Sequence, residues 1–325
     1  MRRLALAISA LFAGGTAPPA TAADLTFHAV NSASFAESVD DDAEKKPEAF
    51  IIRVQVLLDR TDISPGAIDG IRGENLTKAV KTFEEREGLE PDGEIDAEFW
   101  AVLQQDTAPV LETYKITDGD QDGRYVEKIP EDYAEMAKLD WLGFRGPSEM
   151  LAERFHMDED LLKALNPDVS WSKTGSEIVV VSPGEDRKDK VARVIVDRSG
   201  GRLLAYDVSD ELVVAYPATI GSSENPTPSG LHQVKVAIKE PTYSYNPDIN
   251  FQQGKNTEPL ELPAGPNGPI GLVWIDLSKP TYGIHGTPRP DLVGKSPSHG
   301  CVRLTNWDAQ ELADLVEPGV PVEFQ

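Results

Sequence analysis

Apolar residues follow a helical spacing in the first half of the chain and a strand-like spacing in its last third. Between residues 50 and 104 they recur every three or four positions, which predicts amphipathic helices. These positions are Val54, Leu57, Leu58, Ala79, Val80 and Phe83. Two glycine-containing turns, at 65–73 and 88–93, separate the helical stretches. We therefore expect a small three-helix domain over residues 50–104.

A shorter unit over residues 144–183 combines two helical stretches with one apolar run. Residues 151–156 and 161–165 have helical spacing, and Asn166-Pro167 ends the second stretch because proline cannot continue a helix. Residues 178–181 form a continuous apolar run, which predicts a short strand. The pattern indicates a small α+β unit, and residues 105–143 are expected to connect it to the helical domain.

From residue 190 onward, short apolar runs alternate with turns rich in glycine and proline, which predicts strands. The runs are 193–196, 202–206, 212–216, 233–238, 271–277 and 320–324. One helix is predicted at 307–316, with Thr305 at its amino-terminal cap. The fold class is therefore a multidomain chain, in which a mainly-β domain with one packed helix occupies residues 190–325.

The first 22 residues have the three parts of a secretory signal peptide in the usual order. Arg2 and Arg3 precede ten apolar residues at 4–13, and Ala20-Thr21-Ala22 supplies a small-x-small cleavage signal. Ten apolar residues are too few to span the ~30 Å core of a membrane, and no later segment is longer. We expect a signal peptide over 1–22, an acidic flexible segment over 23–49, and secretion to the periplasm or cell wall.

Composition excludes several classes of function. The 325 residues carry a net charge of −24, which argues against nucleic acid as a partner. A single cysteine excludes an internal disulfide framework and a four-cysteine metal cluster. Asp118, Asp120 and Asp122 begin like a calcium loop, but Ile129 stands where the bidentate glutamate belongs. A solvated acidic turn is therefore expected there, and we predict no metal or organic cofactor.

The residues with the clearest chemistry lie near the carboxyl end. The chain's one cysteine, Cys301, stands in Ser298-His299-Gly300-Cys301-Val302-Arg303, and His285 precedes this string. If the string is extended, His299 and Cys301 project to the same face, where the imidazole can take the thiol proton.

Three further residues of this string have candidate roles. The backbone N–H groups of Gly300 and Cys301 are candidate donors to an oxyanion. Arg303 is a candidate to bind a substrate carboxylate or to orient the loop. Alternatively, Cys301 and His299 are ordinary core residues; a lone thiol near two histidines weighs against this.

His285 and the string from Ser298 to Arg303 closely resemble the active-site motif of L,D-transpeptidases, the YkuD-like catalytic domain. The strings at 220–221, 227–230, 267–271 and 283–287 agree, so the resemblance covers residues 190–325. Residues 50–104 resemble the peptidoglycan-binding module of wall hydrolases, and 144–183 resemble part of a LysM module whose first strand is not evident. The resemblance implies an L,D-transpeptidase β-sandwich after two small wall-binding units.

The resemblance also implies a reaction and a role for each residue. Cys301 attacks the carbonyl of diaminopimelate in a tetrapeptide stem of peptidoglycan, D-Ala leaves, and the acyl group passes to an amine to form a 3→3 cross-link. His299 is the general base, His285 orients substrate or stabilises charge, and Ser298 fixes the tautomer of His299. The residues implied to shape the pocket are Trp274, Tyr282, Gly286 and Arg303.

Several alternatives remain open from the sequence. The acyl group can pass to water or to a free D-amino acid, which would make the protein an L,D-carboxypeptidase or an exchange enzyme. An amine of an envelope protein would make it an anchoring enzyme. A wall-binding scaffold with an inert catalytic domain is the non-enzyme alternative. The sequence does not show whether the small units bind glycan.

Overall fold

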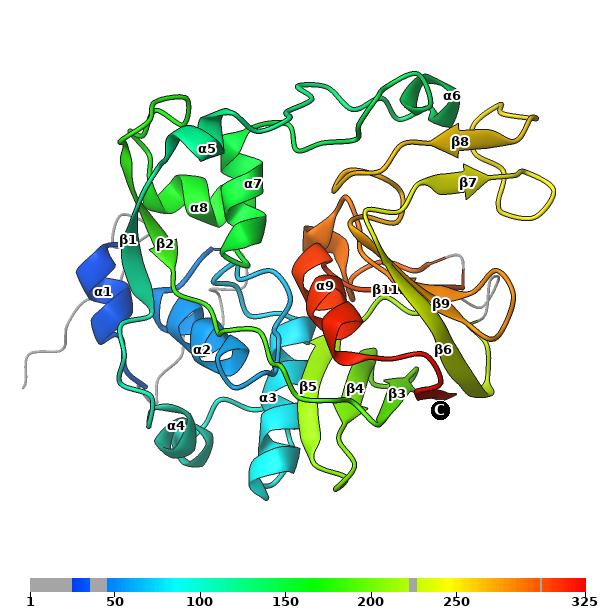
Figure 1. The fold of residues 1–325 in the computed structure, drawn as a ribbon. Helices are drawn as coiled ribbons and strands as arrows, with labels where there is room; N and C mark the ends of the chain where they lie inside the picture. The colour runs from blue at the N-terminus through cyan, green and yellow to red at the C-terminus, as the bar shows by residue number, and fades with distance from the viewer. Residues whose placement is uncertain (1–24, 36–45, 222–226, 299) are drawn as a thin grey trace, which may run out of the picture.

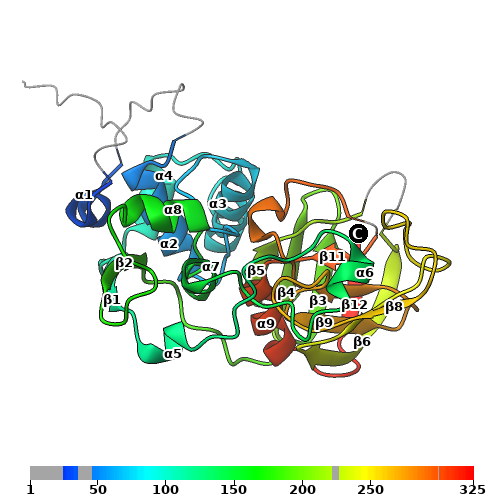
Figure 2. The ribbon, with the colours of Figure 1, turned by 90° about the horizontal axis from the view of Figure 1, so that it is seen from above.

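The chain folds into two lobes that lie side by side (Figure 1, Figure 2). The computed structural model describes residues 25–35, 46–221, 227–298 and 300–325. The predicted signal peptide, the acidic residues 40–44 and His299 lie outside the described residues. None of the helices within these ranges combines the length and the hydropathy needed to cross a membrane.

The three predicted helices of the amino-terminal lobe are confirmed as α2 (Ala49–Asp59), α3 (Glu74–Glu87) and α4 (Ala97–Leu103), after a short α1 (Phe27–Ser32). Helix α3 ends at Gly88, whose left-handed φ of 74° closes the last turn. Helix α4 begins where Asp96 accepts a hydrogen bond from the Phe99 N–H at 2.8 Å. Phe99 packs edge-on against Phe83 at 5.4 Å, so the spacing that predicted the helices also builds their core.

The α+β unit contains a strand that the sequence does not reveal. Strand β1 (Leu111–Lys115) pairs antiparallel with the predicted β2 (Glu177–Val181), and α7 (Pro147–Arg154) and α8 (Glu159–Leu165) lie between them in the chain. The predicted connector over 105–143 therefore contributes a strand of this unit. Only Leu111 of β1 is fully buried, and this explains why the hydrophobic pattern is too weak to predict a strand.

The acidic turn at 118–122 is the short helix α5 (Asp118–Gln121), and the prediction that it is solvated is wrong for Asp120. Asp120 is buried and accepts hydrogen bonds from Tyr114 and Thr117, and Arg154 forms an ion pair with it at 2.7 Å. Although burial raises it, these hydrogen bonds lower the pKa of Asp120 to about 2. Within the described residues no cluster of three or more His, Cys, Asp or Glu is arranged to hold a metal ion.

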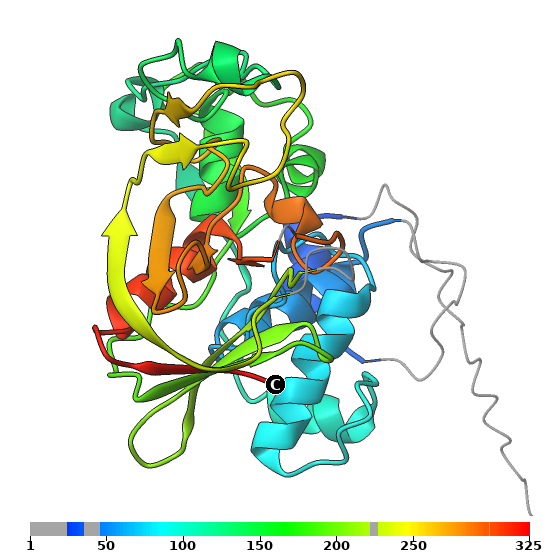
Figure 3. The same ribbon diagram turned by 90° about the vertical axis from the view of Figure 1, so that its right-hand side faces the viewer.

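The carboxy-terminal lobe is one hydrogen-bonded sheet of eight strands in the order β11-β10-β9-β6-β12-β3-β4-β5. Its strands are β3 (Arg193–Asp197), β4 (Arg202–Tyr206), β5 (Leu212–Pro217), β6 (Gly230–Lys239), β9 (Val273–Leu277), β10 (Gly283–His285), β11 (Val302–Arg303) and β12 (Pro321–Phe324). The long strand β6 curves, as Figure 3 shows from the side. Helix α9 (Asn306–Leu315) packs on β6 and β9, which confirms a mainly-β domain with one packed helix.

Two segments extend from the lobes and meet. The strands β7 (Tyr243–Tyr245) and β8 (Leu260–Leu262) form a hairpin beyond the sheet. Residues 122–146, which we call the strap, leave the amino-terminal lobe, carry helix α6 (Tyr133–Met136) and return to α7. Helix α6 lies beside this hairpin (Figure 1, Figure 2). The strap thus brings amino-terminal residues onto the carboxy-terminal lobe.

The two lobes are also joined along the outer strand β5. Ile63 forms a parallel bridge with Ala215, the Ser64 N–H donates to the Ala215 carbonyl at 2.9 Å, and the Ala215 N–H donates to the Asp62 carbonyl at 2.9 Å. Because the chain after α2 covers this edge, β5 presents fewer free backbone groups to solvent.

A second junction joins α7 to α9. The Asn306 side chain donates to the Glu153 carboxyl at 2.9 Å. Burial raises the pKa of the Glu153 carboxyl to about 8, although this hydrogen bond lowers it in part. Glu149 also raises this pKa and Arg145 lowers it. The carboxyl therefore stays protonated at neutral pH in the folded chain.

The Glu153→Gln variant is expected to be more stable than the wild type at pH 8 by several kcal/mol, with about 5 kcal/mol as the upper limit set by the difference between the folded and unfolded pKa values. The folded carboxyl keeps its proton up to about pH 8, whereas an unfolded glutamate releases it near about pH 4.3. Between these values the folded state binds more protons, so wild-type stability falls as the pH rises. Glutamine keeps an acceptor for Asn306 and has no proton to lose.

Urea unfolding at pH 5 and pH 8 measures this difference. The gain should be several times larger at pH 8 than at pH 5, where it should be about 1 kcal/mol. Glu112→Gln, an exposed position on β1, is the matched control. Equal gains for the two variants, or a gain at pH 5 as large as the gain at pH 8, would contradict the role given to Glu153.

Candidate active site

Strand register brings three predicted site residues into one row. His285 of β10 is the partner of Trp274 in β9 and of Arg303 in β11. Partners in neighbouring strands point to the same face of a sheet, so the three side chains lie next to one another. The motif at 298–303 and the isolated His285 are therefore joined by parallel pairing of β10 with β11.

The condition that 298–303 is extended is met only by β11 (Val302–Arg303), because Gly300 and Cys301 before it form a bend. The Ser298 hydroxyl donates to the Cys301 carbonyl at 2.7 Å and accepts from the Gly300 N–H at 3.2 Å. Gly300 has a φ of 112°, which favours glycine, and the strand begins only at Val302.

One of the two predicted oxyanion donors is consequently occupied. The Gly300 N–H is bonded to Ser298 and is not open to a ligand. The Cys301 N–H has no hydrogen-bond partner among the described residues, so it remains the candidate donor of this pair.

The thiol of Cys301 is held in its neutral form. Its Sγ lies 3.8 Å from the Thr281 carbonyl oxygen, to which the thiol can donate. Burial raises the pKa of the Cys301 thiol, while the Gly283 backbone and the Arg303 guanidinium lower it in part. A thiol in this state needs a base to become a nucleophile.

His285 is a neutral imidazole with a defined tautomer. Its Nδ1 lies 2.7 Å from the Gly286 carbonyl oxygen, which can only accept, so Nδ1 carries the proton. Burial, with a smaller effect of Arg303, lowers the pKa of His285 to about 3. The ring stacks on Trp274 at 5.8 Å. Nε2 therefore offers a lone pair, and His285 cannot act as a cation at neutral pH.

Most of the predicted site residues line one cavity of about 530 Å³. They are Trp274, Tyr282, His285, Ser298, Cys301 and Arg303. Gly286 lies against α9, where a Cβ atom would collide with the Asn306 side chain. His299 lies outside the described residues, so its role stays a prediction.

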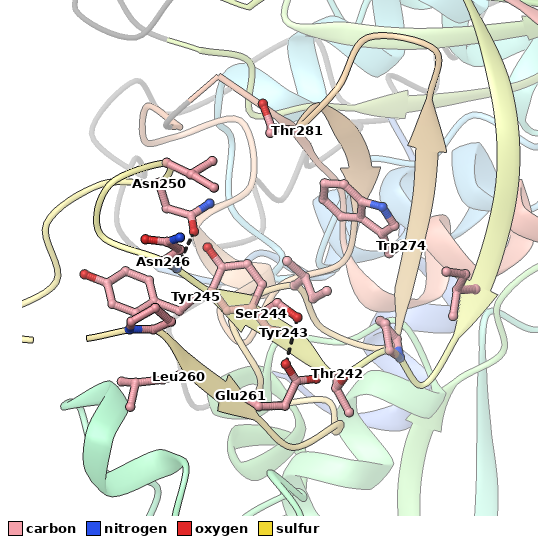
Figure 4. Close-up of a pocket in the computed structure, with 15 residues that line it drawn as sticks. Thr242, Tyr243, Ser244, Tyr245, Asn246, Asn250, Leu260, Glu261, Trp274 and Thr281 are labelled. Carbon is pink, nitrogen blue, oxygen red and sulfur yellow. Dashed lines mark hydrogen bonds between the residues drawn. The ribbon is translucent and has the colours of Figure 1, made fainter. Parts of the chain in front are cut away.

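A second cavity of about 710 Å³, drawn in Figure 4, shares lining residues with the first. Tyr243, Trp274 and Thr281 line both cavities. At the second one, Glu261 accepts hydrogen bonds from the hydroxyls of Thr242 and Ser244, and these lower the pKa of its carboxyl. A reaction that joins two substrates could use two such connected cavities.

Several residues of the first cavity were not predicted from the sequence, and three of them come from three different segments. Tyr133 comes from the strap, Tyr243 from the hairpin, and Thr281 from the turn between β9 and β10. Tyr243 lies in a long segment between predicted strands, and its aromatic residues were the available signal. Nothing in the local pattern around Tyr133 indicates that it reaches a site more than 100 residues away in the chain.

Comparison with known families finds two matches along the chain. Residues 191–324 match the YkuD family, described as "L,D-transpeptidase catalytic domain". Residues 48–103 match a family described as "Putative peptidoglycan binding domain". The resemblance of 144–183 to a LysM module remains a prediction.

Among curated proteins, the "Putative L,D-transpeptidase YkuD" of Bacillus licheniformis is 30% identical over 176 residues, which are 54% of this chain and 92% of that protein. The "Probable L,D-transpeptidase ErfK/SrfK" of Escherichia coli is 30% identical over 187 residues, 55% of this chain and 59% of that protein. A solved L,D-transpeptidase from Mycobacterium smegmatis is 21% identical, with a TM-score of 0.34, over 46% of this chain and 63% of that one. Because the Bacillus licheniformis protein is 30% identical and is matched over 92% of its length, this chain belongs to the YkuD family of L,D-transpeptidases and is an enzyme of that class.

Proposed function

We propose that this protein is an exported peptidoglycan L,D-transpeptidase that works through an acyl-enzyme on Cys301. The observation that carries the proposal is the neutral Cys301 thiol, which opens into the same cavity as His285 and Arg303. The signal-peptide pattern at 1–22 supports export. The membership of the chain in an enzyme family argues against the alternative of an inert wall-binding scaffold.

The first half-reaction forms a thioester. The Cys301 sulfur attacks the carbonyl carbon at the L-centre of diaminopimelate in a tetrapeptide stem, and the bond from this carbon to the D-Ala nitrogen breaks. The thiol proton passes to His299 as general base and then to the departing amine. A thiol with a raised pKa requires such a base, which is the physical reason for giving His299 this role.

Three groups around the thiol support this step. The Cys301 N–H is the proposed donor to the developing oxyanion. His285, neutral and protonated at Nδ1, orients the substrate by accepting a hydrogen bond at Nε2. Ser298 fixes the turn that carries the thiol, and the hydrogen bonds of its hydroxyl support this role beside the predicted one toward His299.

The second half-reaction transfers the acyl group to an amine. The adjoining cavity past Tyr243 and Trp274 offers room for a second stem, whose side-chain amine would attack the thioester and form a 3→3 cross-link. Water, a free D-amino acid or an envelope-protein amine are the alternative acceptors. The peptidoglycan-binding match over 48–103 supports glycan binding by the amino-terminal lobe.

Product analysis tests this proposal. The mature protein is incubated with disaccharide-tetrapeptide muropeptides, with and without D-methionine, and the products are analysed by mass spectrometry. Cross-linked dimer is the expected product; tripeptide alone would indicate hydrolysis, and incorporation of D-methionine would indicate exchange. Unchanged muropeptide would contradict the proposed reaction. Export is tested by the intact mass of the protein from the envelope, which should correspond to a chain beginning at Ala23.

A further inference from the structure

The strap is attached to the carboxy-terminal lobe by hydrogen bonds along its length. The Tyr133 N–H donates to the Gln253 side chain at 3.1 Å, and the Gln253 amide donates to the Glu131 carbonyl at 2.9 Å. Further along, the Leu142 N–H donates to the Ala264 carbonyl at 2.8 Å, and the Leu142 carbonyl accepts from the Asn267 N–H at 2.9 Å. These hydrogen bonds hold the strap to the carboxy-terminal lobe at two places, at Gln253 and at residues 264–267.

Tyr133 is the strap residue that reaches the catalytic cavity. Its ring packs edge-on against three aromatic rings, those of Tyr245 at 5.2 Å, Tyr243 at 6.0 Å and Phe251 at 6.2 Å. Such contacts fix the orientation of the ring. The hydroxyl has no hydrogen-bond partner among the described residues, although Tyr133 lines the cavity with Cys301. The Tyr133 hydroxyl is therefore a hydrogen-bond donor that faces the cavity without an acceptor among the described residues.

Arg303 is a second donor without an acceptor in the same cavity. Its Nε is buried and has no hydrogen-bond partner within the described chain. No described Asp or Glu lines this cavity, although the protein carries a net charge of −24. A largely enclosed guanidinium that lacks a counter-ion favours an anionic ligand, and its planar donors match a carboxylate. The electrostatic influence of Arg303 on both Tyr133 and Cys301 indicates that the three groups are close together.

We propose that the Tyr133 hydroxyl and the Arg303 guanidinium together bind the terminal carboxylate of the stem's leaving residue. This inference rests on the proposed acyl transfer at Cys301. The carboxylate of a leaving amino acid is separated from the scissile carbonyl by only the amide nitrogen and one carbon, so it must lie near the thiol. The strap therefore supplies a substrate-positioning residue from the amino-terminal lobe, and the two donors select stems that end at this residue.

The test compares two acyl donors that differ only at this carboxylate. One tetrapeptide stem ends in the free acid of D-Ala and the other in its carboxamide, and release of D-Ala or its amide gives kcat/KM for each. The wild type should prefer the acid by about tenfold to a hundredfold, the range for hydrogen bonds to a charged group. Tyr133→Phe should lower kcat/KM for the acid by about tenfold and for the carboxamide by clearly less, because a neutral carbonyl oxygen is a weaker acceptor than a carboxylate.

Tyr125→Phe is the matched control, because Tyr125 lies on the same strap and its hydroxyl donates to the Asp120 carbonyl at 2.5 Å, away from the cavity. This variant should leave the kcat/KM for both substrates unchanged. Alkylation of Cys301 by iodoacetamide should proceed at similar rates in all three proteins, showing that the thiol itself is unaffected.

Two outcomes would overturn the inference. Equal losses of kcat/KM for acid and carboxamide in Tyr133→Phe would mean that Tyr133 only supports the structure. A wild type that uses both substrates equally would exclude a carboxylate subsite while leaving acyl transfer intact. A wild type that releases D-Ala from neither substrate would instead contradict the proposed function.

Discussion

Replacing Cys301 with alanine is expected to lower the rate of D-Ala release by about three orders of magnitude or more, while the folded structure is retained. Cys301 is the chain's only thiol, and its Sγ faces the cavity that also contains His285 and Arg303. The substitution removes one sulfur atom from a residue that is only partly buried. The turn around Cys301 is held by the Ser298 hydroxyl and backbone groups, which alanine retains. Activity should therefore fall without a comparable loss of stability.

Two measurements check this expectation. A carbapenem should add its mass to the wild type and leave the Cys301→Ala protein unmodified, because only a nucleophilic thiol can form the adduct. The urea midpoints of both proteins should agree closely. Equal adduct masses for the two proteins, or release of D-Ala by the variant at more than a few per cent of the wild-type rate, would show that Cys301 is not the nucleophile.

The sequence indicates the chemistry of this site more completely than its shape. Cys301, Ser298 and Arg303 occur within six residues, so a local motif suffices to find them. His285 lies close enough to this motif in the chain to be recognised together with it. The strands that hold them could not be predicted from periodicity, because β10 has three residues and β11 has two. Their pairing depends on neighbours distant in the chain, which hydrophobic spacing does not report.

The hydrophobic pattern of the sequence also fails to predict two other features, the hydrogen bonds of Ser298 and the position of the strap. A string of six residues was compatible with an extended strand, and the Ser298 side chain instead closes a turn by bonding to Gly300 and Cys301. Tyr133 lies in what reads as a connector, and its role depends on the hairpin against which it packs. Neither feature leaves a repeating signal in the sequence, because each rests on contacts between specific side chains.

Asn306 is the residue at which the two lobes and the catalytic strands meet. Its side-chain oxygen accepts hydrogen bonds from the backbone N–H groups of Leu272 at 3.2 Å and Thr287 at 3.1 Å. Its amide nitrogen donates to the Glu153 carboxyl of α7 at 2.9 Å. Thr287 lines the catalytic cavity two residues after His285, so Asn306 connects the amino-terminal lobe to the backbone around the site.

Asn306→Ala is expected to destabilise the folded chain by about 3 kcal/mol or more. Alanine leaves the N–H groups of Leu272 and Thr287 and the carboxyl of Glu153 without this partner in an enclosed position, and each unpaired group costs about 1–3 kcal/mol. Urea unfolding followed by the fluorescence of tryptophan measures the loss, and Trp307 is the adjacent residue. The kcat/KM for D-Ala release should also fall, because the backbone that follows His285 loses the hydrogen bond from the Thr287 N–H to Asn306.

Gln310→Ala is the matched control, because Gln310 is an exposed residue of the same helix α9. Its free energy of unfolding should remain within about 0.5 kcal/mol of the wild type. Asn306→Asp separates hydrogen bonding from charge, since aspartate keeps the acceptor for both N–H groups but cannot donate to Glu153 when ionised. Because Glu153 is protonated at neutral pH, its O–H can donate to the ionised aspartate, so the stability of this variant should fall as the pH rises toward 8 and Glu153 loses its proton. If Asn306→Ala cost less than about 1 kcal/mol, these contacts would not join the lobes in the way the geometry indicates.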